Sequence, residues 1–131
     1  MAAQDPSHVL DHVGLAVADL ESARVFYTAA LEPLGFIVVM EFPGVVAFGL
    51  PGQPELWLHQ GAPSAPVHLA LHAADPARVD GFHAAALAAG GIDNGAPGLR
   101  PHYHPGYYAA YVRDADGNNV EAVHHGDPSQ P

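Results

Sequence analysis

The chain has 131 residues, of which 49% are hydrophobic and 14% charged, a composition that suits one globular domain with a buried core. Its formal net charge of -10, with four Arg and no Lys, leaves few cations to neutralise phosphates, so we expect neither nucleic acid nor a membrane as a partner. The chain has no Cys, which excludes disulfides, thiolate metal ligands and thiol catalysis.

The ends and the hydropathy of the chain indicate where it resides. No charged N-terminal region precedes an apolar run, and no apolar stretch reaches the length of about 18 residues that spans a membrane. We therefore expect a soluble, cytoplasmic protein. Residues 1–8 and the tail after residue 125 are polar and contain Pro, so we expect loose ends there.

An internal repeat organises the sequence. The stretch from His12 to Gly35, shifted by 56 positions, aligns with His68 to Gly91, and nine of the 24 paired positions are identical. Two copies are too few for a solenoid, so the repeat predicts two similar modules packed together in one domain. We expect the modules at about 9–60 and 67–125, with the small, uncharged segment 61–66 as the linker.

The first module begins with an alternating strand, HVGLAV, that places Val13, Leu15 and Val17 on one face and His12 on the other. Asp19 is a suitable N-cap for a helix that follows with apolar residues at helical spacing. The stretches FIVVMEF, VVAFGL and ELWLHQ then predict three strands separated by Pro-Gly turns.

The second module repeats this order. VHLALHA predicts a strand with His68 and His72 on its less bulky face, and Asp75 followed by Pro76 predicts a helix start. The stretch 92–106 is dense in Gly, Pro and His, so we expect an irregular loop that lines a site rather than a strand. YYAAYVRD and NNVEAVHH predict a hairpin joined by the turn DADG, and we expect the two histidines that end it to face solvent.

Three side chains fall on the sheet faces that the helices leave uncovered. By the two-residue period of strands, His12, His68 and Glu121 all lie on these faces. Two imidazoles and a carboxylate can hold a divalent metal ion and leave positions open for water or substrate. The alternative is that both histidines are core residues kept neutral by hydrogen bonds, with Glu121 paired to one of them.

The chain resembles the vicinal oxygen chelate superfamily of glyoxalases, extradiol dioxygenases, fosfomycin-resistance transferases and bleomycin-resistance proteins. The resemblance runs from LDHVGLAV and DLESARVFY to DADGNNVEAV. It implies an α+β fold of two βαβββ modules, whose curved mixed sheets enclose a shared cavity, and assembly into a homodimer. It also implies that His12, His68 and Glu121 bind a divalent metal ion, with Zn, Fe, Mn, Ni and Co all suited to these ligands.

Departures from the family patterns leave the reaction open. Glyoxalase I has a second Glu on the fourth strand, where this chain has Trp57, and Trp cannot be a metal ligand. The fosfomycin enzymes have a Thr two residues after the first His, where this chain has Gly14, and most extradiol dioxygenases are about twice as long.

Other side chains are candidates for a role around the metal. We expect His59, His102 or His104 to move a proton, and Arg100 to contact an anion. The alternative for the run RPHYHPGYY is a stiffened surface loop whose aromatic residues seal the mouth of the barrel. We expect the substrate to be lined by the four residues Trp57, Arg100, Tyr108 and His72.

Two functions remain open from the sequence. The first is a divalent-metal-dependent enzyme that acts on a small chelating substrate. The second is a resistance-type protein that binds an aromatic small molecule without chemistry, which the Trp and Tyr residues favour. A third and weaker alternative is a subunit that only scaffolds a partner.

Overall fold

The computed structural model describes residues 9–126, and our expectations for the two chain ends lie outside these residues. The predicted order βαβββ occurs twice. The first module consists of β1 (Val13–Val17), α1 (Leu20–Leu31), the 3-10 turn η1 (Glu32–Leu34), β2 (Ile37–Phe42), β3 (Val45–Leu50) and β4 (Gln53–Gln60). The second consists of β5 (His68–His72), α2 (Pro76–Ala88), β6 (Ile92–Leu99), β7 (Tyr107–Arg113) and β8 (Asn119–His125).

Each module forms its own four-stranded mixed sheet. The strand orders are β1-β4-β3-β2 and β5-β8-β7-β6, and the pairs β1·β4 and β5·β8 are parallel while the others are antiparallel. The two sheets have equivalent registers, because Gly14 lies opposite Trp57 in the first and Ala70 lies opposite Glu121 in the second. The two sheets are not hydrogen-bonded to each other, so one chain does not close them into a barrel.

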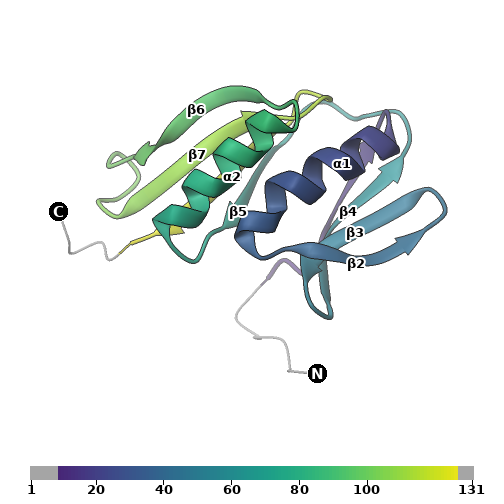
Figure 1. Ribbon diagram of the computed structural model, residues 1–131, viewed down its shortest axis with the longest axis horizontal. Helices are drawn as coiled ribbons and strands as arrows, with labels where there is room; N and C mark the ends of the chain where they lie inside the picture. The colour runs from purple at the N-terminus through teal and green to yellow at the C-terminus, as the bar shows by residue number, and fades with distance from the viewer. Residues whose placement is uncertain (1–8, 127–131) are drawn as a thin grey trace.

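The two helices lie side by side between the sheets, and each covers one face of its own sheet (Figure 1). Both begin as predicted, with the Asp19 carboxylate accepting from Ser22 N and the Asp75 carboxylate accepting from Arg78 N. Their apolar stripes and the helix-facing strand residues form a single core cluster that includes residues of both modules, such as Tyr27, Phe48, Phe82 and Val120. Among residues 9–126 no helix covers the opposite face of either sheet, and we call these the first and second open faces.

The prediction of a loop over residues 92–106 was wrong in its first half. Residues Ile92–Leu99 form β6, and the irregular loop is confined to the segment between β6 and β7. β6 is the edge strand of its sheet and its register shifts twice, between Asp93 and Gly95 and between Gly95 and Gly98. An edge position tolerates Pro97, and the bulges accommodate the glycines, which is why the residues looked unlike a strand.

Within residues 9–126, neither α1 nor α2 is long and apolar enough to cross a membrane.

Candidate functional site

A buried carboxylate on β8 marks the second open face. The Glu121 side chain is 1% exposed, and its Oε1 lies 2.6 Å from His68 Nε2. His68 comes from the first residue of β5, the strand that pairs with β8. A charge taken out of water needs a partner, and here the partner is an imidazole. Two of the three predicted metal ligands therefore lie in direct contact.

Tyr107 holds the other oxygen of this carboxylate. Its hydroxyl donates a hydrogen bond to Glu121 Oε2, which leaves Oε1 directed at His68. Burial, together with this hydrogen bond and the charge of Glu121, raises the pKa of Tyr107 well above its ordinary value. Tyr111, directly opposite Glu121 in the β7·β8 ladder, also has a raised pKa, first because of burial and then because of the charge of Glu121.

The third predicted ligand lies on the first module and does not join this pair. His12 directly precedes β1, is exposed, and its Nδ1 lies 2.7 Å from Asp11 Oδ1. Because a carboxylate only accepts, His12 donates its Nδ1 proton and, when neutral, keeps a lone pair on Nε2. Such an orienting carboxylate is a frequent outer partner of a metal-binding His. Across residues 9–126, no three His, Asp or Glu side chains of one chain gather into a metal site.

The open face of the first module is apolar next to His12. The Trp57 ring lies with its centroid 6.2 Å from that of His12, and its Nε1 is buried without a hydrogen-bond partner among the described residues. Met40 and Phe42 of β2 are 43% and 55% exposed, and by register they share the open face with Trp57. His59 follows Trp57 by two residues on β4 and is also exposed.

Of the predicted proton-transfer residues, His104 contacts Tyr107, the residue that bonds the Glu121 carboxylate. Its ring is 5.5 Å from the Tyr107 ring, and its Nε2 lies 2.9 Å from His125 Nδ1. Gly106 N donates to His104 Nδ1, so a neutral His104 carries its proton on Nε2 and donates it to His125. Burial, with His104 next in importance, lowers the pKa of His125. His102 is exposed and stacks only on Tyr103.

Our prediction that the two C-terminal histidines face solvent was correct for His125, which is exposed, and wrong for His124. His125 bonds His104, and His124 is half-buried with its Nδ1 3.1 Å from the carbonyl oxygen of Ala73. Both belong to β8, so strand alternation sends them to opposite faces, and His125 joins the open face with Glu121.

The remaining predicted substrate residues divide between the two faces of the second sheet. His72 shares the open face with His68, and Arg100 lies with its guanidinium 5.3 Å from the centre of the Tyr111 ring. Tyr108 lies on the helix side instead, where its hydroxyl bonds Asp80 of α2 at 2.7 Å. Tyr107, which we had not selected, donates a hydrogen bond to Glu121, and the Tyr111 ring lies 6.2 Å from that of His68.

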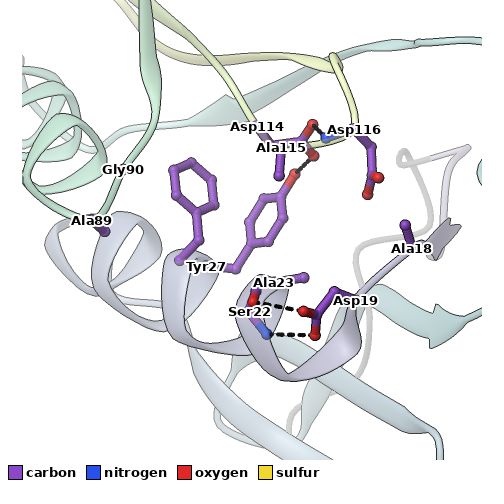
Figure 2. A pocket seen from close by; sticks show the side chains of 11 residues that line it. Ala18, Asp19, Ser22, Ala23, Tyr27, Ala89, Gly90, Asp114, Ala115 and Asp116 are labelled. Atoms are coloured by element: carbon purple, nitrogen blue, oxygen red, sulfur yellow. Dashed lines mark hydrogen bonds between the residues drawn. The ribbon is translucent and has the colours of Figure 1, made fainter.

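A separate cavity of about 240 Å³ lies on the helix side, between α1, the end of α2 and the β7–β8 turn (Figure 2). Two of its three carboxylates are used by the fold: Tyr27 donates to Asp114 at 2.5 Å, Asn118 donates to the same carboxylate, and Asp19 caps α1. Figure 2 shows the Tyr27 hydroxyl directed at Asp114, a contact that joins the two modules. We therefore regard this cavity as part of the scaffold.

The profile of the Glyoxalase/Bleomycin resistance protein/Dioxygenase superfamily matches residues 9–122. No functionally curated protein matches the sequence.

Solved structures resemble the whole chain. A glyoxalase/bleomycin resistance protein from Albidiferax ferrireducens T118 is 31% identical, with a TM-score of 0.80 over 89% of this chain and 99% of that one. A lactoylglutathione lyase from Agrobacterium tumefaciens is 26% identical, with a TM-score of 0.65 over 92% of this chain and 95% of that one. TioX from Micromonospora sp. ML1 shares the fold at 17% identity, with a TM-score of 0.68 over 91% and 100% of the two chains.

Proposed function

Since the chain belongs to the Glyoxalase/Bleomycin resistance protein/Dioxygenase superfamily, we propose that it is a divalent-metal-dependent enzyme acting on a small substrate that chelates the metal through two adjacent oxygens. The observation that carries this proposal is the buried Glu121 carboxylate in contact with His68 and fixed by Tyr107. The donor set suits a metal ion, because imidazole nitrogen and carboxylate oxygen converge from two rigid, adjacent strands.

Within one chain His68 contacts Glu121 but His12 does not join them, so a second chain would supply the third ligand of the proposed set. We propose that the protein acts as a homodimer in which His12 of one chain joins His68 and Glu121 of the other. The exposed apolar side chains of the first open face, Met40 and Phe42, support this arrangement because a second chain could bury them. The Asp11 carboxylate leaves Nε2 of His12 available as a ligand atom.

The chain's own residues would divide the chemical work. A divalent ion at this site would supply a Lewis acid for the substrate oxygens. Tyr107 keeps the Glu121 carboxylate in one orientation, and Trp57 forms an apolar wall beside His12. The proton-moving role falls to His104, because its Nε2 proton is shared with His125 Nδ1 next to the Tyr107 ring.

The identity of residue 57 argues against one reaction of the family. The register places Trp57 at the position equivalent to Glu121, where we expect glyoxalase I to carry a second Glu ligand. We therefore propose a reaction other than that of lactoylglutathione lyase.

A non-catalytic binding protein for an aromatic molecule is the second candidate, and the apolar first open face around Trp57 favours it. Such a protein would bind its ligand without stoichiometric metal and release it unchanged.

Elemental analysis of the protein purified without chelator or affinity tag tests the proposal. We expect about one metal ion per chain, and loss of this metal in His68→Ala with the fold retained by circular dichroism. The control is His83→Ala, which removes an imidazole on α2 that bonds Asp93 instead of Glu121. A metal-free protein after reconstitution with Fe(II), Mn, Ni and Zn would contradict the enzyme and favour the binding protein.

A further inference from the structure

The four arginines of this acidic chain are not used alike. Arg24 forms an ion pair with Glu41 and Arg78 forms one with Asp75, both between exposed side chains on or beside the helices. Arg100 and Arg113 form no ion pair with any residue in the range 9–126. Both of these unpaired cations belong to the second module.

Arg100 is held in place although it has no carboxylate partner. Its Nη2 donates to the carbonyl oxygen of Ala96 at 2.7 Å, and its guanidinium lies over the Tyr111 ring. The nearest carboxylate on β6, Asp93, is engaged by His83 and by the backbone N–H of Gly95. A guanidinium fixed in this way loses little further entropy when it binds an anion.

Two glycines of β6 make room for this guanidinium. A Cβ on Gly95 would lie 2.7 Å from the Tyr111 ring and 3.4 Å from Arg100 Nη2, and a Cβ on Gly98 would lie 3.1 Å from Arg100 Nη1. Gly95 also has a φ of 152°, which L side chains rarely adopt. The irregular edge strand is therefore shaped around Arg100.

Arg113 is on the same face of the sheet, two residues after Tyr111 on β7. With His68, Asn94 and Asn119 it lines a polar hollow of about 460 Å³. The two unpaired cations thus share the second open face with His68 and Glu121. Because the chain's overall charge repels anions, local cations such as these are the side chains best suited to bind one.

We propose that the substrate of this site is an anionic chelator, a molecule that carries a carboxylate in addition to its two adjacent metal-binding oxygens, and that Arg100 and Arg113 bind this carboxylate. The inference rests on the proposed metal site, since it places the chelating oxygens at His68 and Glu121. Guanidinium groups suit a carboxylate because they offer two parallel N–H donors.

A matched pair of probes tests this substrate class. The first probe is 3,4-dihydroxybenzoate and the second is its methyl ester, which keeps both chelating oxygens but lacks the charge. Binding to the metal-loaded protein is measured by titration calorimetry, with the metal content of each sample determined alongside. We expect the acid to bind at least about tenfold more tightly than the ester, as one charge-assisted hydrogen bond provides.

Three variants test whether Arg100 and Arg113 cause the preference for the acid over the ester. Arg100→Gln and Arg113→Gln should each reduce the ratio of the two affinities, and the double variant should bring it to about one. Arg24→Gln is the control, because it changes the net charge equally but removes a cation that is paired with Glu41 on the other module.

The outcomes separate this inference from the proposed function. Equal affinities for acid and ester in a metal-loaded protein would overturn the anionic substrate and leave the metal site standing. A preference that survives in the double variant would overturn the assignment to Arg100 and Arg113. Failure to load metal would overturn the proposed function and this inference with it.

Discussion

At equivalent places in the two repeated modules, the first has the pair His12 and Trp57 and the second has the pair His68 and Glu121. The backbone registers around these pairs correspond, so the scaffold does not distinguish them. The side chains do: the first open face combines one imidazole with apolar rings, whereas the second combines imidazoles, a buried carboxylate and unpaired cations. A duplicated framework can therefore supply a wall from one module and polar chemistry from the other.

Replacing the Glu121 carboxylate would make the second module resemble the first, and we expect the largest effect on metal affinity from this change. We expect Glu121→Gln to lower metal affinity by more than about 100-fold, beyond what loss of an outer partner costs, because it removes the only anionic ligand of the proposed set. Competition with a fluorescent chelator measures the affinity. An unchanged affinity would mean that the difference between Trp57 and Glu121 has no bearing on metal binding.

Removing the support of this carboxylate should have a smaller effect. Tyr107→Phe deletes the hydroxyl that bonds Glu121 Oε2, and we expect metal affinity to fall by about 10- to 100-fold. The same competition assay applies. Tyr103→Phe is the control, because Tyr103 contacts the Tyr107 ring and its hydroxyl does not bond Glu121.

The contact that joins the modules on the helix side should affect stability but not binding. Tyr27→Phe leaves the 6% exposed Asp114 carboxylate without one of its donors, and we expect the free energy of unfolding to fall by about 1 to 3 kcal/mol. Urea denaturation of the metal-free protein measures the change. Unchanged stability together with a lower metal affinity in Tyr27→Phe would contradict this account, because it assigns stability to the helix side and metal binding to the open face.

The smallest expected effect is a pH dependence confined to the second open face. Burial and His104 lower the pKa of His125 below its ordinary value of 6.5, so the unfolded chain binds a proton that the folded chain does not. Stability should therefore fall as the pH drops below about 6.5, until the folded pKa is reached. Between about pH 7.5 and 5.5, the melting temperature of His125→Gln should fall less than that of the unaltered protein. His59→Gln, on the first open face, should behave like the unaltered protein.

Local patterns in the sequence were sufficient for most of the fold. The caps Asp19 and Asp75 and the repeat located both helices, and strand alternation located seven of the eight strands. The eighth, β6, could not be recognised because its Gly95 and Pro97 are tolerated only through bulges and an edge position. Both of those are properties of the assembled sheet.

The sequence predicted only the part of the candidate site that follows from the internal repeat and from strand alternation. The alignment of His12 with His68 and the alternation around Glu121 singled out the contacting pair. Two consecutive tyrosines, Tyr107 and Tyr108, could not be assigned to a face by composition alone. Counting back from the four-residue turn DADG would place Tyr111 opposite Val120, whereas the strands are joined by the five residues 114–118 and Tyr111 lies opposite Glu121. Tyr107 is then on the same face as Glu121 by the two-residue period.

The position of His12 relative to Glu121 could not be predicted from the sequence. Its imidazole is on a different sheet from Glu121, and no contact within the described residues joins them. In our proposal, the three ligands meet only when two chains assemble.

Metal analysis of a mixed dimer tests this central claim most directly. His12→Ala and His68→Ala should each purify without metal as homodimers, since every site would lack a ligand. A heterodimer of the two variants, isolated through a different tag on each chain, has one site with both changes and one with neither. We predict about half a metal ion per chain in this heterodimer. A metal-free heterodimer would contradict a site built from two chains and would mean that one chain supplies all of the ligands.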